Sequence, residues 1–333
     1  MRQSNNLKYI IVVALAMLVV LVTRIGRDVI QPSTTYTLAW GNNNYGIQSV
    51  EITDNRANKS ESNYGFGRNL TIAENGYFVY MPADTGVSAK LVLDSIDEYA
   101  PYLGDIRCDF PSISPDGSYI ACKYLGKIWL INTEYGGMNP LFESSSGATP
   151  GAPIAYNNIV TYPVFVDDVE YIRAVELETR ALLLEIPADQ SPIFNDDGTL
   201  YAVVSENETG DPLIVEVTDI RTRATTTLTM NVGGYNSAEL VALDDDGTQV
   251  LLYAKDSDVL GNSLGGQIVL LSETSTHLLQ STFSNQPVRG DFSEDSRAVA
   301  WSYNNEIYAT TNGLEGDVTY IGSGTYPRWQ KWD

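Results

Sequence analysis

The chain has 333 residues and carries 42 acidic against 20 basic side chains, which gives a formal net charge of −22 at pH 7. Such an acidic chain repels phosphate backbones, so nucleic-acid binding is disfavoured. The single histidine, His277, cannot supply a multi-histidine metal centre, and this disfavours enzymes that rely on clustered histidines.

An apolar run near the N-terminus predicts a membrane anchor. Residues 9–22 are uninterruptedly apolar, lie between positively charged flanks, and are not followed by a small-x-small cleavage site. Together with its flanking residues the run reaches membrane-spanning length. We expect a cytoplasmic N-terminus (1–8), an uncleaved signal anchor or transmembrane helix (9–25) and a short tether (26–34). The rest of the chain would then lie outside the cytoplasm, in the periplasm or beyond the cell; the alternative is secretion after signal cleavage.

From residue 35 onward, degenerate copies of one motif recur every 40 to 49 residues. Each copy is a polar turn followed by a short apolar run, and the spacing is that of a four-stranded propeller blade. The abundance of Tyr, Thr, Val and Ile suits strands rather than helices. The copies centre on Gly76, Gly117, Asn158, Gly198, Gly247 and Ser296.

The copy at 110–132 shows why the motif folds as a blade. Gly117 completes a tight Asp-Gly turn and is free to take a positive φ between two segments that pair as a hairpin. The runs 120–124 and 127–132, separated by a Leu-Gly pair, form a second hairpin. Two hairpins make one blade, and blades stack around an axis because a lone sheet leaves an apolar face uncovered.

The two ends of the chain supply parts of one further blade. The terminal Tyr-Pro-Arg-Trp at 326–329 parallels the first strand of the best copy, while 35–40 and 47–53 look like second and third strands. We expect the C-terminal strand to pair with this N-terminal sheet and to close the ring. The predicted fold class is therefore all-β, a β-propeller of seven four-stranded blades over 35–333 preceded by one transmembrane helix. Six and eight blades are the alternatives.

The Ser-Pro-Asp-Gly turn at 114–117, the Lys-Ile-Trp-Leu-Ile-Asn strand at 127–132 and the terminal Tyr-Pro-Arg-Trp resemble the TolB-like propeller repeat. The resemblance covers roughly 35–333, but only the copy at 110–132 is close to the consensus. It implies a propeller and leans toward an exported protein. Because such repeats also occur in the propeller domains of prolyl-oligopeptidase-type enzymes, it implies no activity.

The chain has two cysteines, Cys108 and Cys122, which lie on either side of the turn at Gly117. On adjacent antiparallel strands they would lie close together, and an oxidising compartment would let them form a disulfide. The alternative is two reduced cysteines that pack as small apolar side chains. Neither version suggests catalysis.

The sequence contains partial matches to catalytic and metal-binding motifs, but each lacks the structural context or the ligand spacing that the motif requires. Ser263 stands in a formal Gly-x-Ser-x-Gly match, but a loop between two strands is not the strand–turn–helix that a nucleophile elbow requires. The aspartate runs at 196–197 and 244–246 lack the alternating ligands of a calcium loop and are predicted to be hairpin turns. We expect no catalytic residue, no cofactor and no metal site. Ca²⁺ binding has no supporting motif, although an acidic surface attracts divalent cations.

We expect a partner surface where the longer connections gather. In an antiparallel blade, the loops that join second to third strands leave on the same face as the connections between blades. The candidate contact loop is 256–266, because it sets apolar residues in a polar setting; the alternative is an insertion without a partner. Its candidate residues are Asp256, Asp258, Val259, Leu260 and Leu264.

The leading functional prediction is a membrane-tethered, non-enzymatic propeller that acts as a protein-interaction module in the cell envelope, with an envelope or membrane protein as partner. The alternative is a carbohydrate- or peptidoglycan-binding propeller, or a glycan-processing one that uses carboxylates near the channel mouth. A pocket of tyrosines and tryptophans with a close carboxylate pair would favour the alternative. A broad face built from loops would favour the leading prediction. A calcium-dependent structural propeller is the third hypothesis.

Overall fold

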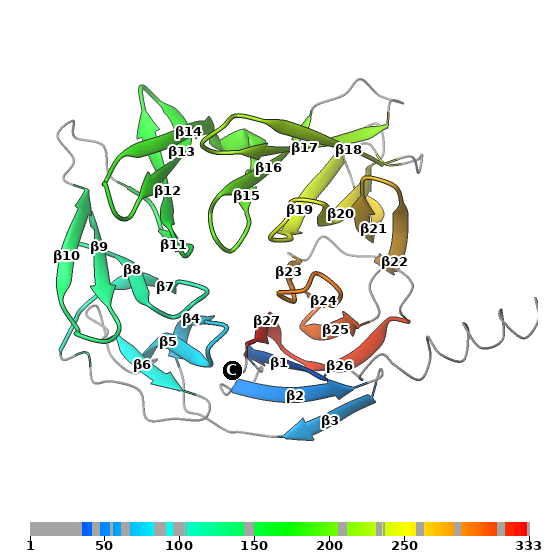
Figure 1. The fold of residues 1–333 in the computed structure, drawn as a ribbon, viewed down its shortest axis with the longest axis horizontal. Helices are drawn as coiled ribbons and strands as arrows, with labels where there is room; N and C mark the ends of the chain where they lie inside the picture. The colour runs from blue at the N-terminus through cyan, green and yellow to red at the C-terminus, as the bar shows by residue number, and fades with distance from the viewer. Residues whose placement is uncertain are drawn as a thin grey trace, which may run out of the picture. The chain divides into compact units, whose positions relative to one another are not determined.

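The computed structural model divides the chain into two compact units, Met1–Thr35 and Tyr36–Asp333. The second unit contains seven antiparallel sheets, which stand around a common axis as the blades of a β-propeller (Figure 1). This confirms the predicted all-β propeller and its seven blades. The structure describes residues 35–41, 47–53, 56–60, 67–82, 91–95, 103, 105–142, 150–205, 212–230, 235, 237–257, 263–282, 288–311 and 317–331.

The predicted transmembrane helix at 9–25 lies outside the described residues. Within the described ranges, no helix combines the length and the apolar character needed to cross a membrane.

We number the blades along the chain and give their strands from the channel outward. Blade 1 contains β27 (Thr325–Gln330), β1 (Thr35–Gly41), β2 (Ile47–Thr53) and β3 (Arg56–Ser60). Blade 2 contains β4 (Gly67–Ile72), β5 (Tyr77–Pro82) and β6 (Val92–Ser95) in its described part. Blade 3 contains β7 (Asp109–Ile113), β8 (Tyr119–Tyr124), β9 (Lys127–Asn132) and β10 (Met138–Phe142).

The remaining blades each have four strands. Blade 4 contains β11 (Ile154–Ala155), β12 (Ile159–Val166), β13 (Val169–Glu176) and β14 (Leu182–Pro187). Blade 5 contains β15 (Ile193–Phe194), β16 (Leu200–Ser205), β17 (Leu213–Asp219) and β18 (Thr225–Met230). Blade 6 contains β19 (Ser237–Leu243), β20 (Gln249–Ser257), β21 (Ser263–Ser272) and β22 (Thr276–Thr282). Blade 7 contains β23 (Arg289–Phe292), β24 (Val299–Tyr303), β25 (Glu306–Thr310) and β26 (Thr319–Ser323).

All six predicted repeat markers lie in turns between the first and second strands of blades 2 to 7. The marker glycines take the left-handed conformation that such turns require, for example φ 73° at Gly117 and φ 68° at Gly198. Ser296 takes the same region at φ 55° without a glycine. The repeat therefore tolerates loss of the glycine where the turn geometry is held by the neighbouring strands.

The core is a series of apolar layers, one between each pair of neighbouring blades. Strand β20 shows the rule, because successive side chains of a strand point to opposite faces. Val250 and Leu252 pack against blade 5, whereas Leu251 and Tyr253 pack against blade 7. A central strand covered on both faces needs a continuous apolar run, and this explains the apolar stretch that follows each marker.

Blade 1 combines both ends of the chain. Strand β27 pairs antiparallel with β1, with Leu38 opposite Trp329 and Ala39 opposite Arg328. The predicted strands at 35–40 and 47–53 correspond to β1 and β2 and occupy the second and third positions of the blade, as expected. This pairing places Arg328 on the channel-lining strand of blade 1.

The antiparallel order gives the propeller two distinct faces. The turn face carries the turns between first and second strands, and the loop face carries the loops between second and third strands and the connections between blades. On the turn face, backbone hydrogen bonds join the turns of neighbouring blades. Examples are Glu74 N to Pro115 O at 2.7 Å, Asn157 N to Asp196 O at 2.9 Å and Lys331 N to Glu74 O at 2.8 Å.

The predicted contact loop at 256–266 is wrong at both ends. Strand β20 continues to Ser257 and β21 begins at Ser263, so Asp256, Ser263 and Leu264 belong to paired strands. Continued pairing satisfies the backbone hydrogen-bonding groups that a loop would leave to water. The other candidates, Asp258, Val259 and Leu260, lie outside the described residues.

Candidate functional site

A cavity of about 1330 Å³ is lined by residues of blades 4, 5 and 6, with further contributions from blades 7 and 1. It is larger than the roughly 300–1,000 Å³ of a typical small-molecule pocket. Toward the turn face its lining is charged: Asp196 follows β15, Asp291 lies on β23 and Arg328 lies on β27. Side chains from three blades therefore meet at one end of the cavity.

Arg328 organises this charged end. Its Nη1 donates to Asp291 Oδ1 at 2.7 Å and to Asp196 Oδ1 at 3.0 Å, and its Nη2 lies 2.8 Å from Asp196 Oδ2. The pairing with Asp196 is thus a two-pronged fork, the arrangement that suits a planar guanidinium best. Nη2 also lies 3.4 Å from Glu74 Oε1. One arginine from blade 1 therefore contacts carboxylates from blades 2, 5 and 7.

Residues on either side of Arg328 fix the end of β27 to the same blades. The backbone N–H of Trp329 donates to Asp291 Oδ2 at 2.7 Å, and its indole Nε1 donates to the carbonyl of Asp291 at 3.1 Å. The amide of Gln330 donates to the carbonyl of Ala73 at 3.2 Å. Lys331 Nζ lies 2.8 Å from the second carboxylate oxygen of Glu74. The C-terminal strand is thus held by both neighbouring blades.

Burial dominates the acid–base properties of this cluster. Burial raises the pKa of Asp291 to about 8, although the positive charge of Arg328 opposes the rise. Burial likewise raises the pKa of Glu74 to about 7, again against the effect of Arg328. Asp245, on the neighbouring turn of blade 6, has its pKa raised to about 6 by burial and by the charges of Asp196 and Asp197.

Burial has the opposite effect on the pKa of Arg328, because it disfavours the charged form of a cation. Burial by itself lowers the pKa of Arg328, but Asp196, Asp291 and Glu74 outweigh that effect, so its pKa is raised overall. The guanidinium therefore stays charged at any pH at which the protein is folded. Its Nε is buried and has no hydrogen-bond partner among the described residues.

Tyrosines and a second ion pair line the rest of the cavity. Tyr156, Tyr162 and Tyr235 contribute to the walls, and burial raises the pKa of Tyr156 and Tyr162. Lys255 Nζ lies 2.7 Å from Glu239 Oε2. Among the described residues that line the cavity there is no tryptophan. The site thus combines aromatic and polar surface.

Both carboxylates at the charged end of the cavity are committed to Arg328. A general acid or nucleophile must be able to contact a substrate, whereas Asp291 already accepts hydrogen bonds from Arg328 and from the Trp329 backbone. With 7% exposure, its side chain has little surface left for a ligand. The arrangement suits ion-pair cross-linking between blades better than proton transfer to a bound molecule.

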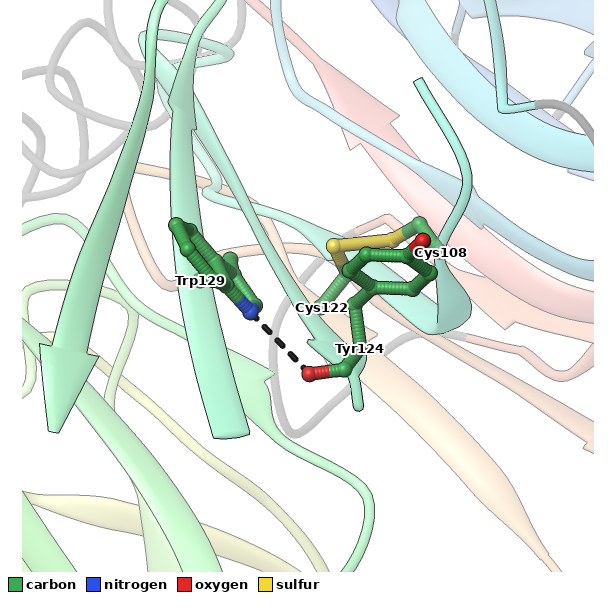
Figure 2. The surroundings of a disulfide bond; sticks show 4 residues. All are labelled: Cys108, Cys122, Tyr124 and Trp129. Atoms are coloured by element: carbon green, nitrogen blue, oxygen red, sulfur yellow. Dashed lines mark hydrogen bonds between the residues drawn. A yellow bond between two sulfur atoms is a disulfide. The ribbon is translucent and has the colours of Figure 1, made fainter. Parts of the chain in front are cut away.

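Cys108 and Cys122 are joined by a disulfide, with their Cα atoms 5.7 Å apart. Cys122 lies on β8 opposite Trp129 of β9, whose indole N–H donates to the carbonyl of Tyr124 at 3.0 Å (Figure 2). Both cysteines are buried in the layer between blades 2 and 3. The bridge fastens the segment leading into β7 to the second strand of its own blade.

The other residues singled out from the sequence stand apart from this site. His277 lies on β22, the outermost strand of blade 6, opposite Leu270. The aspartate runs form hairpin turns as expected; Asp244, for instance, accepts from the backbone N–H of Gln249 at 3.0 Å and from Thr248 Oγ1. Across the described part of the chain, no group of three or more His, Cys, Asp or Glu side chains could hold a metal ion.

The sequence reasoning missed the cluster of Glu74, Asp196, Asp291 and Arg328. The residues are far apart in sequence; Glu74 and Arg328, for example, are separated by 254 in residue number. One signal was present, however. An arginine in the middle of a predicted channel-lining strand needs a carboxylate partner, because an unpaired buried charge is very costly.

No protein-family model matches the chain, and no curated protein matches it. An oligogalacturonate lyase in complex with manganese is similar in structure, with a TM-score of 0.57 and 12% identity over 88% of this chain and 85% of that chain. The β-propeller domain of the trilobed protease from Pyrococcus furiosus has a TM-score of 0.51 and 14% identity over 78% and 85% of the two chains. TolB from Acinetobacter baumannii has a TM-score of 0.47 and 12% identity over 88% and 82%. The first two similarities show the propeller fold and nothing finer.

Proposed function

We propose that the protein is a membrane-tethered, non-enzymatic β-propeller that acts as a protein-interaction module in the cell envelope. The observation that carries this proposal is the fork between Arg328 and Asp196, completed by Asp291. Asp196 and Asp291 are the carboxylates at the charged end of the cavity, and their ion pairs with Arg328 commit them to cross-links between blades. What remains is a rigid ring with two faces, a scaffold suited to presenting a binding surface.

Ring closure is part of this proposal. The pairing of β27 with β1, the ion pairs of Arg328 and the apolar layers on both sides of blade 1 all support a ring with no open edge at that blade. An exposed sheet edge in an export compartment would invite aggregation, and closure removes it.

Two features support a location outside the cytoplasm. The disulfide between Cys108 and Cys122 fits an oxidising compartment, since cytosolic thiols are kept reduced. The apolar run at 9–22 without a following cleavage site supports an uncleaved anchor. Together they support our proposal that the propeller lies on the outer side of the membrane that anchors it.

The proposal is tested by crosslinking the tagged full-length chain in intact cells, solubilising the membranes and identifying what copurifies. A tagged anchor that consists of residues 1–34 alone serves as the control. We expect the same envelope or membrane protein to be recovered reproducibly with the full chain and not with the control. Recovery of glycan fragments alone, or of nothing beyond the control, would contradict the proposal.

The second candidate is binding or processing of a carbohydrate or peptidoglycan. The cavity favours it, because Tyr156, Tyr162 and Tyr235 line a large polar space that contains a close carboxylate pair. Its test is incubation of the purified chain with a panel of cell-wall and plant polysaccharides, followed by chromatography of the products. We expect neither cleavage nor saturable binding. Turnover that disappears in Asp291→Asn would favour this candidate over the proposed function.

A further inference from the structure

Five large apolar side chains are exposed on the loop-face side of blades 3 and 4. Leu125 is 79% exposed, Phe165 59%, Ile154 52%, Phe110 50% and Val169 46%. We call these five residues the blade 3–4 patch. Isolated apolar side chains on a surface are ordinary, but a concentration on one face of two neighbouring blades indicates a contact surface.

The patch occupies equivalent positions in the two blades. Leu125 lies at the tip of the hairpin between β8 and β9, and Phe165 and Val169 flank the tip of the hairpin between β12 and β13. Both tips are loops between second and third strands, so both emerge on the loop face.

The inner part of the patch joins the two blades at the channel. Phe110 lies near the start of β7, and Ile154 opens β11 and also lines the cavity. These strands are neighbours, because the backbone N–H of Ala155 donates to Ser112 Oγ at 3.0 Å. The patch therefore extends from the hairpin tips to the edge of the cavity.

The backbone at Leu125 argues for a functional role. Leu125 has φ 48°, in the left-handed region that leucine rarely adopts. The equivalent tip in blade 7 consists of Asn304 and Asn305, with φ 53° and 61°, and asparagine tolerates this region well. A leucine at this tip carries backbone strain that asparagine would largely avoid, and it also exposes apolar surface. Contact with another molecule accounts for both.

The charges around the patch define its partner. Asp167, Asp168 and Glu170 are exposed on the same hairpin as Phe165 and Val169. Lys123 and Lys127 flank the other hairpin and are only half-exposed. The whole chain is also strongly acidic, with a net charge of −22. A complementary surface is therefore apolar and basic.

We propose that the blade 3–4 patch docks a segment of a partner protein that carries apolar side chains beside lysine or arginine. The inference rests on the proposed function and names the face and the chemistry of the interaction. Anionic lipid is disfavoured as the occupant because Asp167 and Asp168 would face like charges. A second copy of the chain is disfavoured for the same reason, since its patch would present the same carboxylates.

The test uses the full-length chain in phosphatidylcholine nanodiscs and two fluorescent peptides of about 15 residues. One peptide combines leucine and phenylalanine with lysine, and the other has glutamate in place of every lysine. By fluorescence anisotropy we expect the basic peptide to bind at least about tenfold more tightly than the acidic one. Leu125→Asn and Phe165→Thr should each weaken this binding at least about fivefold. The control is Leu278→Asn, at a 48% exposed position on β22, which should leave binding unchanged.

Leu125→Asn also separates loss of contact from loss of fold. Because asparagine relieves the left-handed strain, the variant should melt about 1–3 °C higher while it binds the peptide more weakly. A variant that melts lower, or binding of the basic peptide that is unchanged in both patch variants, would overturn the inference.

Other occupants give distinct results, each of which would also overturn it. If the acidic peptide binds as tightly as the basic peptide, the partner is not recognised by basic side chains. Patch-dependent binding to phosphatidylglycerol vesicles would identify a lipid surface, and patch-dependent self-association in sedimentation would identify a second copy. If the crosslinked partner from cells is retained in Leu125→Asn, the patch inference fails while the proposed function stands. If no partner is recovered with the unmodified chain, the proposed function itself fails.

Discussion

At the scale of single residues, one arginine cross-links the blades around the channel of this propeller. Arg328 is only 15% exposed and contacts Asp196, Asp291 and Glu74. Three carboxylates around one guanidinium carry an excess of negative charge, which Lys331 partly offsets through Glu74. The cluster is therefore both a cross-link between blades and a source of pH dependence.

Removal of this cation should be strongly destabilising. In Arg328→Met the buried carboxylates lose their shared partner, and breaking a buried ion pair in this way costs about 3–5 kcal/mol. Urea denaturation gives the change in the free energy of unfolding. The matched control is Arg221→Met, since Arg221 is 65% exposed in its pair with Glu176 and should contribute less than about 1 kcal/mol. Equal losses in the two variants would show that Arg328 has no special structural role.

The same cluster predicts how stability depends on pH. Asp291 and Glu74 have pKa values of about 8 and 7, above their ordinary values of 3.8 and 4.5. The folded state then keeps protons that the unfolded chain has released, so these groups favour folding most at low pH and lose that contribution as pH rises toward about 8. We expect the free energy of unfolding to fall between about pH 5 and pH 8 at constant ionic strength.

The variant Asp291→Asn tests whether Asp291 causes the predicted fall in the free energy of unfolding with rising pH. Asparagine keeps an acceptor for the Trp329 N–H but cannot titrate, so the pH profile should become flatter. A slope as steep as that of the unmodified chain would place the titration elsewhere.

At the scale of secondary-structure elements, the turn face is held by close packing between neighbouring turns. Gly198 has φ 68°, and a Cβ there would lie 2.4 Å from Ile159 Cγ1 of blade 4. Gly126 has a similar φ of 75° at the tip of a hairpin, but nothing lies within 4 Å of its would-be Cβ. A comparison of substitutions at these two glycines therefore separates the effect of backbone strain from the effect of steric conflict.

Gly198→Ala should therefore destabilise the protein more than Gly126→Ala. Both changes carry the cost of a left-handed alanine, about 1–2 kcal/mol, and only the first adds overpacking of about 1–3 kcal/mol. Paired urea titrations measure the difference. Equal effects would mean that neighbouring turns can move apart freely.

The disulfide acts at the same scale, because it ties the lead-in of β7 to β8. Cys108 and Cys122 are 14 residues apart, and closing a loop of that length stabilises a fold by about 3 kcal/mol. Reductant should lower the melting temperature of the unmodified chain and leave the double variant Cys108→Ala/Cys122→Ala unaffected. An unmodified chain that melts identically with and without reductant would contradict the bridge.

The strands were predictable wherever turn chemistry and apolar period agreed. In blade 3, the glycine turn at Gly117 and the runs at 120–124 and 127–132 correspond closely to β8 and β9. The loop at 256–266 was not predictable in extent, because polar Asp256 pairs with Gly265 in a ladder that composition does not reveal. Cross-strand pairing depends on the partner strand as much as on the residues themselves.

At the scale of the whole molecule, the seven-bladed architecture followed from repeat spacing and from the split of one blade between the two ends of the chain. The candidate site could not be predicted from repeat spacing, because Arg328 contacts carboxylates that come from three separate blades. Repeat spacing predicts which strands line a channel, whereas side-chain encounters across it depend on how the blades stand around the axis. The proposed location of the propeller outside the cytoplasm rests on the N-terminal apolar run and the disulfide together.

The central claim is that this propeller binds a protein partner through its loop face. Its most direct test is quantitative crosslinking in intact cells that express the unmodified chain, Leu125→Asn or Leu278→Asn at equal levels. Our account predicts one envelope or membrane protein that is recovered with the unmodified chain and with Leu278→Asn and is depleted in Leu125→Asn. Recovery of no protein partner, together with cleavage of a polysaccharide by the purified chain, would contradict it.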